Sequence, residues 1–368
     1  MPNELLKKQL ALTLIPGIGS VLAKTLLKHC GSAEQVFNEK KSRLEKITGI
    51  GSVLASSIVK SKEAMILADK EVAFMQRQGI RTLFYTDDSF PPRLRHCNDG
   101  PVMLFVKGTS ALHAPRVVSI VGTRSATDYG KKLCRQLVEA MQGKGMLIAS
   151  GLAYGIDICA HKAALQHDIE NVAVLGSSID RIYPDLHASV AEKIMDNGAL
   201  VSEYVSNTGP EKENFPKRNR IIAGLADAVI VVEAARKGGA LITAEIANAY
   251  QRDVFAFPGD VDNKYSQGCN MLIKTNKAQL AESYNDIEYI MGWMEKAVKK
   301  KTIQFPLFTE MDADEKSVYT IICNHPSCSI DTLCMHVSMP SSKVSLILFQ
   351  LEMKNLIKAL PGNMYKAN

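Results

Sequence analysis

The glycines in turns that precede helical patterns are the residues of this sequence whose types and spacing point most clearly to a chemical role. Gly122 lies in VGTRSATDYG, Gly151 and Gly155 lie in SGLAYG, and Gly238 and Gly239 lie in RKGGALITA. A glycine turn at the start of a helix can present backbone N–H groups to an anion, and the helix dipole adds partial positive charge there. The chemistry that these turns could support is therefore the binding of phosphate groups.

Cationic side chains accompany the turns. Arg124 comes two residues after the first glycine, and the run KRNR occupies residues 217–220. One glycine turn is weak evidence, but several at one sheet edge, together with these cations, predict a basic rim of phosphate size. The alternative is that each glycine serves only its own turn, and that Arg218 and Arg220 form a solvated or ion-paired face.

The sequence patterns of common catalytic sites are weak or missing. No G-x-G-x-x-G follows the first strand pattern, no Walker lysine follows the glycine turns, and no G-x-S-x-G occurs. Asp157 and His161, four residues apart on one helix face, could form an acid–base pair or half of a metal site, but such a pair is more often a local structural contact. We therefore expect binding without catalysis, with no cofactor and no metal ion.

Eight cysteines are scattered through the chain, and no secretion signal precedes them. We expect reduced thiols without disulfide bridges. Near the end of the chain, the spacing C-x-H-x2-C-x5-C-x-H fits no standard zinc site, so buried thiols are the better interpretation. The residues in that spacing are Cys323, His325, Cys328, Cys334 and His336.

The elements that must position the glycine turns are strands and helices in alternation. From Arg116 to Ala278, six short apolar runs are separated by helical patterns, and such runs without alternation indicate strands buried on both faces. The runs are VVSIVG, MLIASG, VAVLG, ALVSEY, AVIVVEA and VFAFPG. This rhythm predicts the α/β class, with a doubly wound, Rossmann-like parallel sheet. Ligands of such sheets lie beyond the carboxyl ends of the strands, where the glycine turns fall.

The first 80 residues contain an internal near-repeat, in which the string GIGSVLA occurs twice. A helical apolar stripe follows each copy. It consists of Val21, Leu22 and Leu26 after the first copy, and of Val53, Leu54 and Ile58 after the second. This is the helix-hairpin-helix pattern, whose glycines could hold a DNA backbone without reading bases. The alternative is a packing motif that needs its glycines only for the turn. The possible phosphate contacts are Gly17, Gly19, Gly49 and Gly51.

The remaining segments complete the predicted organisation. The stretch AVKKKTIQFPLFTEMD indicates a linker, and the last 55 residues predict three short helices and a two-stranded wing, as in a winged helix. The expected domains are a helical domain at 1–80, an α/β domain at 81–295 with its core at 116–278, a linker at 296–311, and a winged helix at 312–368.

The 368 residues are 46% apolar and 22% charged, which is typical of a soluble globular protein. The net charge is +6, and most of it lies in the first 80 residues, where twelve Lys and Arg face seven Asp and Glu. No stretch approaches the roughly 20 apolar residues of a membrane helix, and the N-terminus carries charges where a signal peptide is apolar. We therefore expect a cytoplasmic protein with no membrane partner.

Five strings in this order, VGTRSATDYG, ASGLAYGIDICAHKAAL, FPKRNRIIAGL, VVEAARKGGALITA and FPGDVDNKYSQGCNMLI, resemble the DNA-processing protein A family, also called DprA or Smf. The resemblance extends to DDSFPPRL, to the N-terminal hairpins and to the winged-helix tail, so it covers nearly the whole chain. One departure is KGGALITA, where the family more usually has SGSLITA. The missing serine puts a side-chain hydrogen bond there in doubt and leaves the backbone turn intact.

The resemblance implies a homodimeric protein of natural transformation that binds single-stranded DNA, protects it and loads RecA onto it. It also implies a dimer contact near Ala278 to Trp293, and the hairpins could add contacts to double-stranded DNA. Arg124 and Lys217 are the leading pair for phosphates, and Phe215 could support a base. The candidate DNA-binding residues are Gly122, Arg124, Ser125, Ser150, Gly151, Gly155, Phe215, Lys217, Arg218, Asn219, Arg220, Gly238, Gly239 and Thr243.

Two other functions remain open. The same type of sheet serves nucleotide phosphoribohydrolases, whose PGGxGT loop has only a distant counterpart in RKGGALITAE, with Glu245 as the nearest acid. A transcription factor could instead read duplex DNA with its winged helix while the α/β domain senses a ligand. The third helix of the tail carries only Lys343 and Lys354 among apolar residues, so a protein-contact or regulatory role is at least as good an interpretation of the tail.

Overall fold

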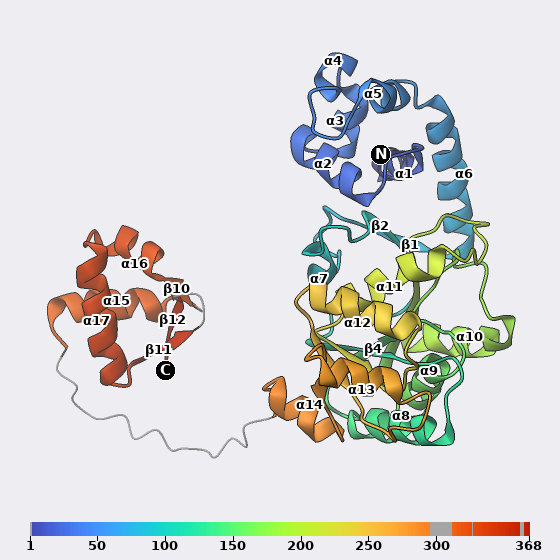
Figure 1. Cartoon of the computed structure of the whole chain (residues 1–368). Helices are drawn as coiled ribbons and strands as arrows, with labels where there is room; N and C mark the ends of the chain where they lie inside the picture. The colour runs from blue at the N-terminus through green and yellow to red at the C-terminus, as the bar shows by residue number, and fades with distance from the viewer. Residues whose placement is uncertain (1, 295–310, 326, 361–363) are drawn as a thin grey trace. The chain divides into compact units, whose positions relative to one another are not determined.

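The computed structural model describes residues 2–294, 311–325, 327–360 and 364–368, and it divides into two compact units, Met1–Met294 and Glu295–Asn368. The predicted linker at 296–311 lies outside the described residues, except for Met311. Figure 1 shows the elements of both units along the chain. No described helix is both long enough and apolar enough to cross a membrane.

The first unit begins with six helices, and the predicted hairpin repeat lies within them (Figure 1). Gly17 and Gly49 have φ of +83° and +88°, values that favour glycine, and a helix begins three residues after each. A Cβ on Gly17 would lie 2.9 Å from Leu54, and one on Gly49 would lie 2.8 Å from Leu22. The helices are α1 (Pro2–Leu14), α2 (Ser20–Cys30), α3 (Ala33–Asn38), α4 (Lys41–Leu44), α5 (Ser52–Val59) and α6 (Lys62–Gln78).

These two contacts are reciprocal, because Leu22 and Leu54 hold the same place in the two copies of GIGSVLA. Each hairpin turn therefore packs against the helix of the other. The expected apolar stripe is wrong at its first position, since Val21 is 54% exposed and its counterpart Val53 is 77% exposed. The buried positions are Ala23 and the predicted Leu26 in α2, with Ala55 and the predicted Ile58 at the same places in α5, and their spacing follows the 3.6-residue period.

The α/β part is built on a nine-stranded sheet in the order β1-β2-β6-β5-β4-β3-β7-β8-β9. All six predicted strands are present and run parallel, which confirms the doubly wound arrangement. Two strands from the connecting segment and one from the end extend the sheet. The strands are β1 (Arg81–Phe84), β2 (Met103–Gly108), β3 (Arg116–Val121), β4 (Met146–Ser150), β5 (Glu170–Val174), β6 (Gly198–Ser202), β7 (Ala228–Val231), β8 (Asp253–Ala256) and β9 (Gln279–Leu280).

The sheet has a switch point between β3 and β7. From β3 the chain winds outward through β4, β5 and β6, and it then returns to the other side of β3 as β7. The sheet is not parallel throughout, because β2 pairs antiparallel with both β1 and β6. Ligand sites of doubly wound sheets lie at such a switch point, beyond the carboxyl ends of the strands. The loops after β3, β4 and β7 all reach this edge.

Helices cover both faces of the sheet (Figure 1). Val117 and Val121 of β3 pack in one core with α11 and α12, whereas Val118 and Ile120 pack in a second core with α8 and α9. This alternation explains the continuous apolar runs of the sequence. The helices of this part are α7 (Pro92–Arg95), α8 (Asp128–Ala140), α9 (Ile156–Gln166), the 3-10 helix η1 (Asp185–His187), α10 (Ala188–Asp196), α11 (Asn214–Leu225), α12 (Gly239–Ala249), α13 (Gln267–Lys274) and α14 (Tyr284–Ile290).

The second unit contains the three predicted helices and the wing, with a small sheet in the order β10-β12-β11. The first helix begins earlier than predicted, because Asp312 and Glu315 form a capping box at its N-terminus. Residues 361–363 of the predicted wing lie outside the described residues. The elements are α15 (Ala313–Cys323), β10 (Cys328–Ser329), α16 (Ile330–Val337), α17 (Ser341–Met353), β11 (Ile357–Leu360) and β12 (Met364–Ala367).

Candidate nucleic-acid interface

The loop after β3 is held rigidly, while the side chain of Arg124 is left exposed. A Cβ on Gly122 would lie 2.4 Å from Ile156, so close packing against α9 requires glycine there. The backbone N–H of Thr123 donates to the carbonyl of Glu233 after β7, at 2.7 Å. The Glu233 carboxylate also accepts from the N–H and the hydroxyl of Thr127, which caps α8. These bonds join the loops of the two strands at the switch point.

Arg124 lies beside an aromatic ring. Its guanidinium carbon is 5.5 Å from the centroid of the Phe215 ring, which is within the range of a cation–π contact. Arg124 forms no ion pair with any carboxylate in the described ranges, so its charge remains available to a ligand. The ring of Phe215 in turn lies 5.6 Å from that of Tyr183, measured between centroids.

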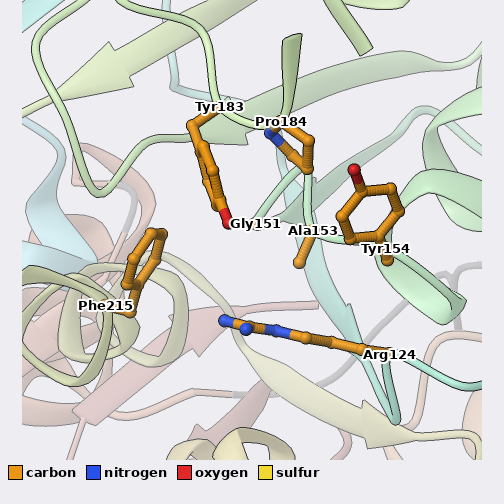
Figure 2. Close-up of a pocket in the computed structure, with 7 residues that line it drawn as sticks. All are labelled: Arg124, Gly151, Ala153, Tyr154, Tyr183, Pro184 and Phe215. Atoms are coloured by element: carbon orange, nitrogen blue, oxygen red, sulfur yellow. The ribbon is translucent and has the colours of Figure 1, made fainter. Parts of the chain in front are cut away.

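A pocket opens between these groups, as Figure 2 shows. Phe215 and Tyr154 stand on opposite sides of it in this view, and the Arg124 guanidinium lies between them. Tyr154 and Tyr183 are 42% and 43% exposed, so their rings can contact a ligand. The residues that line the pocket are Arg124, Gly151, Ala153, Tyr154, Tyr183, Pro184 and Phe215.

The loop after β4 supplies the floor of the pocket through its backbone. A Cβ on Gly151 would lie 2.4 Å from the Arg218 guanidinium and would displace it, and one on Gly155, whose φ is +80°, would lie 2.1 Å from the Thr123 carbonyl, so Gly155 requires glycine. Ser150 is fully buried, and its hydroxyl donates to the carbonyl of Ile120 at 2.6 Å. The Ser150 side chain therefore ties β4 to β3 and does not reach the surface of the pocket.

The segment FPKRNR is helical, and this changes the interpretation of its cations. The sequence places it in a loop, but residues 215–220 belong to α11, so neighbouring side chains point in different directions. Lys217 is exposed, whereas Arg218 is only 4% exposed. Arg220 forms an ion pair with Glu203. The expectation of a run of exposed cations is wrong at Arg218 and Arg220, for these reasons of helix geometry and pairing.

Arg218 serves the loops from inside. Its guanidinium donates to the carbonyl of Gly151 at 2.6 Å and to that of Val174, and its Nε donates to the Asn219 side chain. Burial lowers the pKa of Arg218 to about 10, and the nearby Asp157 partly offsets this effect. Burial also raises the pKa of Asp157, which Arg218 opposes. The buried cation and carboxylate thus balance each other beneath the pocket.

The turn after β7 is exposed at both glycines. A Cβ on Gly238 would meet no atom within 4 Å, and one on Gly239 would come no closer than 3.7 Å to Asn219. The Gly239 carbonyl accepts from the Thr243 hydroxyl at 3.0 Å and from the Asn219 amide at 3.3 Å. These two candidate side chains therefore support the turn.

The two members of the possible acid–base pair have separate structural partners. His161 is fully buried and bonds through Nδ1 to the Asn171 side chain at 2.7 Å, and burial lowers its pKa to about 4. Asp157 accepts hydrogen bonds from backbone groups of the Gly151 loop. Glu245, the acid of the enzymatic alternative, pairs with Lys277 at 3.2 Å. Across the described ranges, no three His, Cys, Asp or Glu residues are placed to hold a metal ion.

The structure therefore brings together Arg124, Gly151 and Phe215, as the sequence led us to expect. Ser125 is exposed in the same loop as Arg124. Sequence reasoning missed Tyr154 and Tyr183. The first could have been found from its place in the glycine loop after β4, but no pattern in the sequence marks Tyr183. The hairpin glycines Gly17, Gly19, Gly49 and Gly51 are exposed and lie in the helical part of the first unit, away from the lining of this pocket.

Comparison with known proteins gives consistent matches along the chain. Residues 81–291 match the family model described as DNA recombination-mediator protein A. Residues 10–61 match the SAM-like helix-hairpin-helix tandem, and residues 308–363 match the DprA winged helix domain. Protein Smf of Escherichia coli K12 is 36% identical over 310 residues, which cover 80% of this chain and 79% of the relative. Protein Smf of Synechocystis is 30% identical over 394 residues and covers 97% of each chain.

Two solved structures are also similar. DNA processing protein A of Streptococcus pneumoniae has a TM-score of 0.66 and 32% identity, over 78% of this chain and 97% of that one. DNA processing protein A of Helicobacter pylori, whose structure concerns a single-stranded DNA binding mode, has a TM-score of 0.53 and 31% identity, over 58% of this chain and 96% of that one.

Proposed function

Because this chain belongs to the DNA recombination-mediator protein A family, also called DprA or Smf, we propose that it binds single-stranded DNA in natural transformation. In this role it protects DNA that enters the cytoplasm and loads RecA onto it for homologous recombination. The observation that carries the proposal is the exposed Arg124 guanidinium beside the Phe215 ring at the carboxyl edge of the sheet. The single-strand binding mode of the Helicobacter pylori relative supports the same ligand.

The pocket combines the two features that a single strand needs. The Arg124 cation suits a phosphate oxygen, and the rings of Phe215, Tyr154 and Tyr183 offer stacking surfaces to a base. A base inside a duplex is stacked on its neighbours and paired, so a ring cannot reach its face without the cost of flipping the base out. The pairing of cation and aromatic rings therefore favours single strands over duplex DNA.

The candidate residues divide into those that contact DNA and those that support them. Arg124, Lys217 and Phe215 contact it with their side chains, together with Ser125 and the backbone of Gly122, Gly151, Gly238 and Gly239. The supporting residues lie beneath or behind the contact surface, where their hydrogen bonds, ion pairs or close packing fix the loops. They are Ser150, Gly155, Arg218, Asn219, Arg220 and Thr243.

A homodimer and further DNA contacts extend the proposal. The segment Ala278 to Trp293 is our candidate dimer surface, and it exposes Leu280 (47%) and Tyr289 (69%) on β9 and α14. The hairpins are our candidate contact to duplex DNA, through backbone N–H groups that do not read bases. The domain limits at 80 and 295 belong to the same proposal, with a helical, an α/β and a winged-helix domain that bind and hand over DNA without a catalytic step.

The test is a titration of a fluorescent oligo(dT) strand with full-length protein, followed by anisotropy. We expect Arg124→Ala to weaken binding by about tenfold or more, because a phosphate contact and a cation–π support are lost together. Arg77→Ala removes an exposed arginine from α6 and should leave the affinity within about twofold. Equal affinities for Arg124→Ala and the native protein would overturn the proposed site.

Ligand class is tested in the same assay with a duplex of equal length. We expect the single strand to bind more tightly than the duplex, and Phe215→Ala to reduce this difference because a stacking surface is lost. Phe349→Ala removes an aromatic ring that is 61% exposed on α17, outside both the pocket and the candidate dimer surface, and it serves as the aromatic control for DNA contact. Release of a free base from AMP above a buffer blank would instead support the phosphoribohydrolase alternative.

A further inference from the structure

Two cysteines meet where α8 crosses α9. The Sγ of Cys134 lies 3.9 Å from the carbonyl oxygen of Ile156, and the Sγ of Cys159 lies 3.6 Å from that of Lys131. Each thiol therefore points to the carbonyl three residues before the other cysteine. This reciprocal arrangement places both sulfur atoms in the same crossing of the two helices. Their roles are not explained by DNA binding, because neither cysteine lines the pocket.

The two thiols have different surroundings. Cys134 is fully buried, whereas Cys159 is partly exposed. A hydrogen bond from the Cys134 thiol lowers the pKa of Cys159 to about 7, and the positive charges of Arg135, Lys131 and Lys162 act in the same direction. The same hydrogen bond, together with burial, raises the pKa of Cys134. The pair therefore favours the nucleophilic thiolate at Cys159 and the protonated thiol at Cys134.

We propose that Cys159 is an oxidation site for peroxides and that Cys134 resolves the product as an intramolecular disulfide. The Cys159 thiolate attacks one peroxide oxygen, the O–O bond breaks, and the departing oxygen leaves as water after protonation. Cys159 is then a sulfenic acid. The Cys134 sulfur attacks the Cys159 sulfur, the S–O bond breaks, and a second water carries away the hydroxyl group and the Cys134 proton. Two thiols and one hydrogen peroxide thus give one disulfide and two waters.

The bridge would join the two helices that follow the first two loops of the pocket. Cys134 lies in the second turn of α8, whose N-terminus follows the Arg124 loop, and Cys159 lies in the first turn of α9, which follows the Gly151 loop. A covalent link at this crossing would restrain the spacing of the loops. The oxidation itself depends only on the cysteine pair, so its test stands apart from DNA binding.

The experiment treats reduced full-length protein with hydrogen peroxide at pH 7, blocks the remaining thiols and maps tryptic peptides without reductant. We expect a disulfide that links LCR, residues 133–135, to GMLIASGLAYGIDICAHK, residues 145–162, and its loss after reduction. Cys134→Ala should remove the link and leave a Cys159 sulfenic acid that dimedone traps. Cys134→Ser gives a second such variant, and circular dichroism confirms that each is folded. No linked peptide, together with no dimedone adduct at Cys159, would overturn the proposal.

The pH dependence of Cys159 alkylation gives an independent test of the positive charges around this thiol. We expect the alkylation rate of Cys159 by iodoacetamide to rise with a midpoint near pH 7, below the roughly 8.5 of a free cysteine peptide. Arg135→Gln should slow the reaction at pH 7 by about threefold, because less thiolate is present. Lys132→Gln removes an exposed cation from the same helix and should change nothing. A pH profile equal to that of the free peptide would contradict the proposed role of Cys159.

Discussion

Lys217 and Arg218 are neighbours in the chain, but the geometry of α11 places one side chain in solvent and the other in the interior. Lys217 is exposed, whereas Arg218 is 4% exposed and donates to the carbonyls of Gly151 and Val174. We expect Arg218→Ala to lower the free energy of unfolding by about 3 kcal/mol, because buried carbonyls lose their donor and Asp157 loses its counter-charge. Urea unfolding of the full chain, followed by circular dichroism, measures this loss.

Lys217→Ala is the matched comparison, since it removes a cation from the next position of the same helix. We expect its unfolding free energy to change by less than about 0.5 kcal/mol, as is usual for an exposed side chain. Its affinity for a single strand should fall, and the slope of log K against log salt should decrease by about 0.7, the value for one phosphate contact. Equal losses of stability in the two variants would mean that helix position does not separate their roles.

His161 gives the fold a dependence on pH. It is fully buried and its pKa is lowered to about 4, whereas an unfolded histidine titrates near 6.5. Between these values the unfolded chain takes up a proton that the folded protein does not. The contribution of His161 is therefore fully present above pH 6.5 and is lost as the pH falls toward 4, by ~3 kcal/mol in total.

The measurement compares urea midpoints at pH 7 and pH 4.5. We expect His161→Gln to lose less stability on acidification than the native chain, although it starts from a lower value at pH 7. His29→Gln replaces an exposed histidine at the end of α2 and should follow the native chain at both pH values. An equal acid response in native and His161→Gln proteins would rule out this histidine as the cause.

How far the site could be predicted differs between residues. Arg124 and Gly151 stand in glycine turns directly after strands, so the topology of a parallel sheet places them at one edge. Tyr183 lies after a different strand, and the chain reaches the pocket through a loop that no periodicity describes. The sequence groups FPKRNR with the residues that follow a strand, but the segment lies in α11, where Pro216 stands in the first turn, a position that tolerates proline.

At the scale of elements, each hairpin contains one glycine that the fold requires and one that alanine could replace without a steric clash. Gly49 has φ +88°, and a Cβ there would lie 2.8 Å from Leu22. Gly51 has an ordinary φ of −81°, and a Cβ there would meet no atom within 4 Å. We expect Gly49→Ala to destabilise the fold by about 1–3 kcal/mol, and Gly51→Ala to cost less than about 1 kcal/mol.

Thermal unfolding of the two variants checks this difference, with the native chain measured alongside. Gly51→Ala then becomes the informative variant for DNA, because it adds a methyl group at the start of α5 without disturbing the packing. If the second hairpin holds a phosphate, this variant should weaken duplex binding. An equal loss of stability in both variants would show that the reciprocal contact between the hairpins does not decide the role of Gly49.

The elements themselves were largely predictable, since all six core strands and the hairpin repeat follow from the sequence. Buried parallel strands are apolar throughout, and glycine breaks mark their ends. The antiparallel pairing of β2 with β6 could not be predicted, because periodicity identifies a strand and not its neighbour or its direction. The exposure of Val21 and Val53 was missed for a similar reason, as it depends on how the two hairpins pack together.

At the scale of the whole molecule, the third helix of the second unit, α17, has little charge to offer a nucleic acid. The two lysines of α17 and its end are paired within the unit, Lys343 with Asp314 and Lys354 with Glu315. The exposed side of α17 carries Leu346 (58%) and other apolar side chains instead. A helix that reads duplex DNA presents free cationic and polar groups, so these pairs favour a protein-contact role for α17.

We therefore expect a chain that ends at residue 294 to bind a single strand within about twofold of the full-length affinity. The pocket and its supporting bonds lie entirely within the first unit, and phosphate contacts supply most of the affinity of such proteins. Anisotropy titrations at two salt concentrations compare the two lengths. Arg124→Ala should weaken both lengths by the same factor, because the site that it removes is common to them. A truncated chain that binds more than tenfold more weakly, with an unchanged melting profile of its first unit, would instead assign part of the DNA contact to the winged helix.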